Sequence, residues 1–249
     1  MCRHLAYLGP PCSVGELLTR GPHSLRTQGW APRDMRGGGL VNADGYGAAW
    51  WVAGAPVRYR TERPVWTDAS GAAVLGAARS GAVLLALRSA SVGMPVVYTA
   101  NAPFTDGRWA FSHNGVVRGW PHSLVALAQS LPVTDLLTLD APTDSALLWA
   151  LLRARLPHQE PAAAVAELVG AVAAAASGSR LNLLLSDGEH IVATAWHHAL
   201  SVLVTDDAVV VASEPHDDDP AWQLVPDRSV VTARPGQVTL TRLDPNEEL

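Results

Sequence analysis

A cysteine stands at the second position of the chain, directly after the initiator methionine. Removal of Met1, which a small second residue permits, would leave Cys2 with both a thiol and a free α-amine. A free α-amine has a pKa of about 7.7–8.0 and a thiol a pKa of about 8.5, so the amine can accept the thiol proton near neutral pH. Taken alone, Cys2 is an incidental residue beside a start methionine. With suitable partners it is an N-terminal nucleophile.

A second candidate group lies near the middle of the chain, where residues 111–115 read Phe-Ser-His-Asn-Gly at the end of a predicted strand. Acyl transfer needs two hydrogen-bond donors aimed at the oxygen that becomes negative in the transition state. The side-chain amide of Asn114 and the backbone N–H of Gly115 could supply them. Without Cys2, the same pair would predict an ordinary Asn-Gly turn.

Arg88 and Asp144 are candidates for substrate binding. Arg88 ends an apolar run and precedes the small residues 89–93, which suits bidentate capture of a carboxylate but also a simple strand end. Asp144 stands at a predicted helix start, where it is either a capping acid or a carboxylate that pairs with an ammonium group. An arginine and an aspartate that converge on one pocket would recognise the α-amino acid end of a substrate.

Apolar runs and turn signals predict strands at both ends of the chain and helices in the middle. The expected strands are 2–8, 46–53, 57–60, 82–88, 109–113, 181–185, 191–196, 201–204 and 209–212, with two more near Ser229 and Gln237. The expected helices are 69–80, 121–130, 145–156 and 161–176, and residues 21–39 are expected to form a long loop. This order is not a βαβ alternation. It predicts a single α+β domain over residues 1–249 with antiparallel sheets.

Composition narrows the classes of function. The net charge is −5, so the chain lacks the basic character that nucleic acids or anionic membranes require. The N-terminus lacks the apolar core of a signal peptide, and two cysteines are too few for a secreted disulfide scaffold, so we expect a cytoplasmic protein. The histidines at 197, 198 and 216 and the aspartates at 217–219 show no recognised metal-ligand spacing. We therefore expect neither a metal nor an organic cofactor.

Six short motifs occur in one order along the first two-thirds of the chain. They are Met1-Cys2, Asn42-Ala43-Asp44-Gly45-Tyr46-Gly47, Arg88-Ser89-Ala90-Ser91, Asn101-Ala102-Pro103-Phe104, His113-Asn114-Gly115 and Thr143-Asp144-Ser145. Together they resemble the class II glutamine amidotransferases of the N-terminal-nucleophile (Ntn) hydrolase superfamily. The resemblance implies a four-layer αββα sandwich with two stacked antiparallel sheets.

Within that family, residues 2–5, 41–45, 88–95, 102–107 and 112–117 are most similar to the stand-alone amidohydrolases of ergothioneine biosynthesis. Those enzymes remove glutamate from γ-glutamyl-hercynylcysteine sulfoxide. The resemblance implies that Cys2 is the nucleophile, that its α-amine is the base, and that Asn114 and Gly115 are the oxyanion donors. It further implies that Arg88 binds the glutamyl α-carboxylate, that Asp144 binds the α-ammonium, and that Ser91 lies near the ligand.

Three alternatives remain open at this point. A general glutaminase or glutamine amidotransferase subunit shares every glutamyl contact, although Ala102 stands where many relatives have His and the length leaves little room for a synthase domain. An Ntn acylase acting on penicillin-like or bile-salt amides would have an apolar pocket in place of Arg88 and Asp144. A catalytically silent binding protein on the same fold would tolerate a retained Met1.

The leaving amine of the sulfoxide substrate carries a trimethylammonium group, which aromatic faces bind. Trp30 in the long early loop and Tyr98 are the candidates for this contact. The expected partner is a small-molecule γ-glutamyl substrate, with no nucleic acid and no membrane. The oligomeric state is left open by the sequence, with a homodimer as one option.

Overall fold

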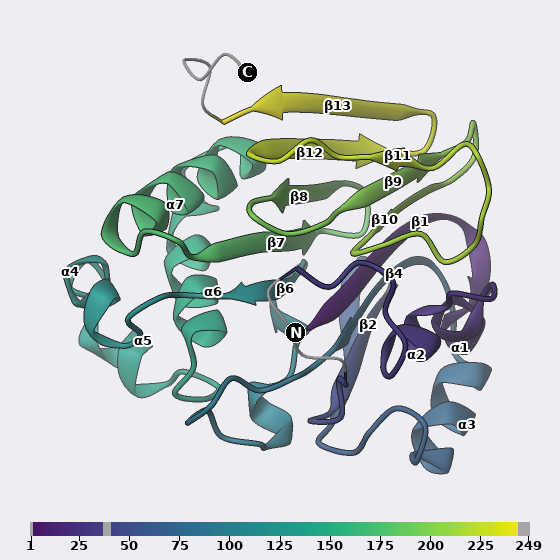
Figure 1. Ribbon diagram of the computed structural model, residues 1–249, viewed down its shortest axis with the longest axis horizontal. Helices are drawn as coiled ribbons and strands as arrows, with labels where there is room; N and C mark the ends of the chain where they lie inside the picture. The colour runs from purple at the N-terminus through teal and green to yellow at the C-terminus, as the bar shows by residue number, and fades with distance from the viewer. Residues whose placement is uncertain (1, 37–40, 244–249) are drawn as a thin grey trace.

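The computed structural model describes residues 2–36 and 41–243, and it places two antiparallel sheets face to face between two layers of helices (Figure 1). Met1 and the Gly37-Gly38-Gly39 part of the predicted loop lie outside the described residues. The predicted four-layer α+β sandwich is confirmed.

The first sheet has seven strands, with β1 near its centre. Its order is β11 (Gln223–Leu224), β9 (Ser201–Val204), β10 (Val209–Ala212), β1 (Arg3–Ser13), β4 (Arg79–Leu87), β2 (Tyr46–Val52) and β3 (Ala55–Thr61). Three helices flank this sheet, α1 (Val14–Thr19), α2 (Leu25–Gln28) and α3 (Ala69–Ala77). Apolar residues of all three pack with Leu5 and Tyr7 of β1 on the outer face of the sheet.

The second sheet has six strands and carries the longer helices. Its order is β13 (Gln237–Arg242), β12 (Ser229–Arg234), β8 (Ile191–Ala195), β7 (Arg180–Ser186), β6 (Trp109–Val116) and β5 (Phe104–Asp106). Helices α6 (Asp144–Arg155) and α7 (Pro161–Ala175) cover its outer face, and the short helices α4 (Val125–Ala128) and α5 (Val133–Leu137) lie beside α6.

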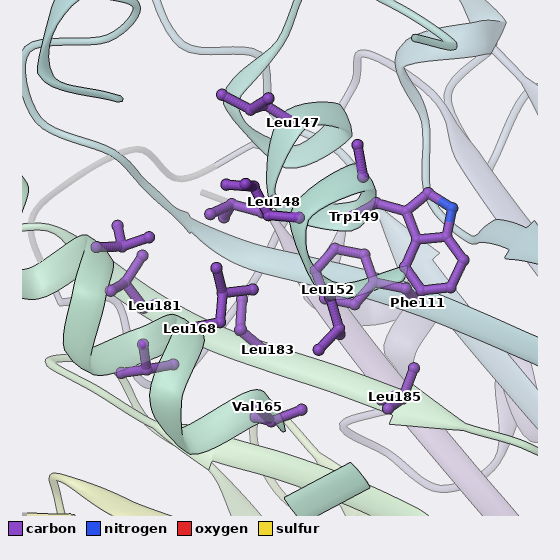
Figure 2. Packing of buried hydrophobic residues seen from close by; sticks show 14 of the residues in the cluster. Phe111, Leu147, Leu148, Trp149, Leu152, Val165, Leu168, Leu181, Leu183 and Leu185 are labelled. Carbon is purple, nitrogen blue, oxygen red and sulfur yellow. The ribbon is translucent and has the colours of Figure 1, made fainter. Parts of the chain in front are cut away.

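The packing of α6 and α7 on the second sheet forms the largest apolar core (Figure 2). The ring of Phe111 from β6 stacks on Trp149 of α6, with ring centroids 5.5 Å apart. Leu168 of α7 and Leu183 of β7 are fully buried in the same cluster. Each such leucine contributes about 1.5–3 kcal/mol by its removal from water, so this layer holds the second sheet rigidly in place.

Strand alternation gives each sheet an inner and an outer face. In β1, Leu5 and Tyr7 point to the first helical layer, whereas Ala6 and Leu8 face the second sheet. In β6, Ala110 faces the first sheet. Alanine and valine dominate the layer between the sheets, and such small side chains let the two sheets approach closely. His4, two positions before Ala6, and Ser112, two positions after Ala110, lie in the same inner layer, where His4 Nδ1 is 3.3 Å from Ser112 Oγ.

Several element boundaries differ from the sequence prediction. The strand expected over 2–8 continues to Ser13, and a register shift between Leu8 and Cys12 accommodates the prolines that cannot donate to a ladder. The expected loop 21–39 contains α2, and the expected helix 121–130 begins as a 3₁₀ turn before α4. Asp187-Gly188, a dipeptide that favours hairpin turns, lies in the connection between β7 and β8, and Gly188 has φ +89°.

The strand expected over 109–113 does not end in a turn at Asn114-Gly115. Strand β6 runs on to Val116, and Asn114 and Gly115 pair with Asn182 and Leu181 of β7. Glycine at position 115 lets β6 stay close to β7, because a Cβ there would collide with the carbonyl oxygen of Arg180.

No helix among the described residues is long and apolar enough to cross a membrane.

Candidate active site

The pairing of β1 with β4 brings Cys2 and Arg88 together. The register joins Arg3 to Leu87, which places Arg88 directly across from Cys2. Both side chains open into one small cavity, whose other polar walls are Ser112, His113 and Ser145. Apolar side chains, including Phe104 of β5, complete the lining. The Cys2 thiol is half-buried, and its Sγ lies 3.7 Å from the carbonyl oxygen of Ser89.

Asp44 fixes the backbone on both sides of Arg88. Its carboxylate Oδ2 accepts the N–H of Ala90 at 2.7 Å, and its own N–H donates to the carbonyl oxygen of Arg88 at 3.1 Å. The mostly buried Arg88 guanidinium donates to the carbonyl oxygen of Pro95 at 2.8 Å through Nη1. The 42–47 motif therefore positions Arg88 through Asp44.

Two glycines of the 42–47 motif let it pack against the segment 101–104. Gly45 has φ +111°, and a Cβ there would collide with the Asn101 side-chain amide, which donates to the carbonyl oxygen of Thr61 at 2.6 Å. A Cβ on Gly47 would collide with the carbonyl oxygen of Ala102. These contacts explain why the two motifs occur together, because the second supplies the Ala102 and Phe104 walls of the cavity.

Asn114 and Gly115 lie beside this cavity rather than in its lining. The Asn114 side chain is fully buried; its Nδ2 donates to Ser213 Oγ at 3.1 Å, and its Oδ1 has no hydrogen-bond partner. His113, between Ser112 and Asn114, places its Nε2 2.9 Å from the carbonyl oxygen of Arg180. A carbonyl oxygen only accepts, so Nε2 carries a hydrogen and Nδ1 faces the Ser145 hydroxyl at 3.0 Å.

Asp144 is the first residue of α6, as the sequence predicted, but the capping residue is Thr143, whose side chain accepts the N–H of Ala146. The Asp144 carboxylate accepts the N–H of Val117 at 3.0 Å and the N–H of Ser145 at 2.7 Å. It therefore ties the start of α6 to the end of β6. Asp144 is buried next to the cavity, and its neighbour Ser145 lines it.

A buried ion pair anchors the segment around Arg33 beside the start of β1, and sequence reasoning missed it. The fully buried Arg3 places Nη2 3.9 Å from the Glu214 carboxylate and 2.7 Å from the carbonyl oxygen of Asp34, to which it donates. The same Glu214 carboxylate accepts the N–H groups of Arg33 and Asp34 at 3.0 and 2.7 Å. The alternation of side chains along β1 does not predict this ion pair, because a charged residue on the outer face of a sheet is usually exposed.

Three residues proposed near the ligand do not line the cavity. Ser91 is exposed. Trp30 is 45% exposed and packs edge-on against Trp66, with ring centroids 5.5 Å apart. Tyr98 is 54% exposed, and the Arg60 guanidinium lies over its ring.

The histidines and aspartates near residue 216 do not gather into a metal site. Asp218 pairs with Arg33 at 2.8 Å, and Asp217 accepts the indole N–H of Trp222 at 2.8 Å. Across the described residues, the one group with metal-type ligand atoms close together is Asp187, Glu189 and His190 at the β7–β8 turn. Arg108 occupies two of those carboxylates with ion pairs of 2.8 and 3.2 Å.

Two histidines next to the site are buried, and their environment disfavours a proton. Burial lowers the pKa of His4 to about 3, helped by the nearby His113. Burial also lowers the pKa of His198 to about 3, helped by the positive charge of Arg3. The N–H of Ala199 donates to His198 Nδ1 at 2.8 Å, and the Arg3 guanidinium lies 3.4 Å from Nε2. An imidazolium at this position would therefore have no acceptor for its hydrogens.

The free energy of unfolding should fall as the pH falls below about 6.5, because the unfolded chain takes up protons on His4 and His198 that the folded chain excludes. The loss continues down to the folded pKa near 3, at up to about 1.4 kcal/mol per pH unit for each histidine. Urea unfolding between about pH 7.5 and about pH 5 measures this slope. His198→Gln should show a shallower fall, and an identical slope would contradict the assignment.

Known proteins of one family match most of the chain. Residues 22–207 match the model of the class-II glutamine amidotransferases. A γ-glutamyl-hercynylcysteine sulfoxide hydrolase of Mycolicibacterium smegmatis is 42% identical over 245 residues, which is 98% of this chain and 100% of the relative. The hydrolase of the same name from Mycobacterium tuberculosis is 41% identical over 244 residues, 98% of this chain and 97% of the relative.

Solved structures share the fold. A class-II glutamine aminotransferase domain protein of Silicibacter pomeroyi superimposes with a TM-score of 0.69 at 24% identity, over 98% of this chain and 100% of the other. Glutamine phosphoribosylpyrophosphate amidotransferase of Bacillus subtilis gives a TM-score of 0.68 at 14% identity, over 98% of this chain and 50% of the other. With the matched family model and the near-complete alignment to the two hydrolases, these results show that the chain belongs to the class-II glutamine amidotransferases.

Proposed function

We propose that this chain hydrolyses the γ-glutamyl amide bond of γ-glutamyl-hercynylcysteine sulfoxide, releasing glutamate and hercynylcysteine sulfoxide. The observation that carries the proposal is the shared cavity of Cys2 and Arg88, which puts a nucleophile opposite a carboxylate-binding cation. The 42% identity over nearly the full chain to a hydrolase of that name supports the choice of substrate.

The reaction begins when the α-amine of Cys2 takes the thiol proton and Sγ attacks the γ-carbonyl carbon. The carbonyl oxygen becomes negative, and the Asn114 Nδ2 and the Gly115 N–H stabilise it. Collapse of this intermediate breaks the C–N bond, and the α-ammonium returns its proton to the leaving amine. A glutamyl thioester remains on Cys2. Water then attacks the thioester with the α-amine again as base, and glutamate leaves as the thiol regains its proton.

The glutamyl group is held by opposite charges at its α-carbon. Arg88 binds the α-carboxylate: its Nη1 donates to the carbonyl oxygen of Pro95, and no other hydrogen bond of the guanidinium is found among the described residues. Asp144 binds the α-ammonium with lone pairs that its contacts to Val117 and Ser145 leave free. A cytoplasmic location suits this chemistry, since Cys2 and Cys12 are both free thiols and the nucleophile acts only when reduced.

The test is a direct comparison of substrates. The value of kcat/KM should be higher for γ-glutamyl-hercynylcysteine sulfoxide than for glutamine, and mass spectrometry after rapid quenching should find a glutamyl adduct on Cys2. Equal or faster hydrolysis of glutamine would replace the proposal with a general glutaminase. Absence of any Cys2 adduct during turnover would remove the covalent mechanism.

Arg88→Gln should lower kcat/KM by about 10- to 100-fold, because the glutamyl carboxylate loses a charged hydrogen-bond donor. The effect should appear mainly in KM, since the carboxylate is bound equally in the ground state and the transition state. Steady-state kinetics with the sulfoxide substrate measure both constants.

Arg79→Gln is the matched control for this variant. Arg79 begins the same strand, is exposed, and donates to the carbonyl oxygen of Pro11 at 2.9 Å at the end of β4 away from Cys2. Its kinetics should equal those of the unmodified enzyme. An Arg88→Gln enzyme with unchanged KM would show that the glutamyl carboxylate is bound elsewhere.

A further inference from the structure

Ser213 lies directly after the last residue of β10 and is fully buried. Its N–H donates to the carbonyl oxygen of His4 at 2.9 Å, and its Oγ accepts the N–H of His4 at 2.9 Å. Two hydrogen bonds thus fix Ser213 to β1, two residues beyond the Cys2 thiol. The side chain of Ser213 points inward, toward the second sheet.

The same Ser213 Oγ accepts a hydrogen from Asn114 Nδ2 at 3.1 Å, across the gap between the two sheets. An amide nitrogen has two hydrogens, and they point in directions about 120° apart in one plane. Once one of them is bound to Ser213, the direction of the second is set. No other hydrogen-bond partner of the Asn114 side chain is found among the described residues, and its Oδ1 is buried without one.

We propose that Ser213 is the positioning residue of the oxyanion hole: its hydroxyl holds one N–H of Asn114 so that the other points at the carbonyl oxygen attacked by Cys2. This inference rests on the proposed function, which makes Asn114 an oxyanion donor. The Asn side chain has a broad terminal torsion, so the strand backbone alone does not fix the plane of its amide. Because Ser213 is bonded to His4 of β1, it also sets the place of the donor relative to the nucleophile.

The predicted consequence is a loss in kcat without a loss in binding. Ser213→Ala removes the acceptor and lets the Asn114 amide turn, and we expect kcat to fall about 10-fold. The KM for the sulfoxide substrate should change by less than about 2-fold, because the oxyanion forms only in the transition state. A Ser213→Ala enzyme with an unchanged kcat would overturn the proposal.

A double-mutant cycle separates positioning from a general structural role. Asn114→Ala should lower kcat by about 10²–10³-fold, and adding Ser213→Ala to that variant should then cost less than about 2-fold. An equal loss from Ser213→Ala in both backgrounds would show that Ser213 acts through the fold and not through Asn114. Full activity of Asn114→Ala alone would instead reject the oxyanion role in the proposed function.

Two further variants guard against an effect of folding. Ser213→Cys keeps the shape of the side chain but offers a weaker acceptor, so it should fold and still lose kcat; wild-type kcat in this variant would overturn the proposal. Ser186→Ala is the matched control, since Ser186 is equally buried and its Oγ donates to the carbonyl oxygen of His190 at the far end of β7. Its kcat should not change.

Discussion

Cys2→Ala, which replaces the thiol by a hydrogen atom, should abolish turnover and leave substrate binding intact. The loss in kcat should be at least about 10⁴-fold, because alanine has no atom that can form the glutamyl thioester. Single-turnover assays give the rate, and calorimetric titration with the sulfoxide substrate gives the affinity.

Cys12→Ala is the control for this variant, because Cys12 is also a half-buried free thiol of β1 but lies at the other end of the strand. Its kcat should stay within about 2-fold of the unmodified enzyme, as expected for a conservative change away from the site. Measurable turnover by Cys2→Ala that survives repurification would mean that the thiol is not the nucleophile.

The second large effect concerns the amine of the same residue. An enzyme with a removable tag fused directly before Cys2 should be silent, because an amide nitrogen in place of the α-amine cannot accept the thiol proton. General-base catalysis contributes about 10²–10⁴-fold, and this is the loss we expect. Proteolysis that leaves Cys2 as the first residue should restore activity in the same preparation.

The comparison before and after cleavage needs no second variant, since the folded chain is identical in both states. Mass spectrometry confirms which residue comes first, and the rate with the sulfoxide substrate is measured at each extent of cleavage. Activity should rise in proportion to the fraction of cleaved chain. A tagged enzyme with full activity would exclude the α-amine as the base.

Periodicity and turn chemistry predicted most of the fold because they report burial, which a single strand or helix encodes by itself. The run around Leu84 is apolar at every position, and the run around Leu183 is apolar except for Asn182, because both faces of those strands are covered. The strand β1 was predicted too short, because Pro10 and Pro11 ordinarily end a strand and only the pairing partner reveals the register shift that tolerates them.

The residue types of the candidate site could be predicted from the sequence, but the hydrogen bonds that position them could not. Cys2, Arg88 and Asn114 were identified from local motifs, and the register of β1 on β4 brings the first two together. The contacts that hold them come from residues far away in sequence: Asp44 on the backbone of Arg88, and Ser213 on Asn114. No local pattern encodes such long-range hydrogen bonds, so they emerge only when the strands are paired.

The predicted binding of the trimethylammonium group by Trp30 or Tyr98 depended on side-chain type alone, and it stays a prediction, since neither ring lines the Cys2 cavity. Trp30 is turned toward Trp66, and Tyr98 stacks with Arg60. An aromatic ring in a loop can pack against many kinds of side chain, so its residue type alone does not indicate which site it contacts. Charged residues opposite a nucleophile carry more information, because burying them without a ligand or partner is costly.

The central place of β1 in its sheet has a consequence for how the enzyme comes into being. The strand that carries the nucleophile pairs with β10, where Leu5 is opposite Ala212, so its docking needs contacts between the two ends of the sequence. Contacts of such long separation slow folding, because the chain must close a large loop before they form. We therefore expect Cys2 to reach its final position only once the chain has been synthesised as far as β10. The amide protons of Leu5 to Tyr7, flanked by β10 and β4, should then exchange as slowly as those of the deepest core.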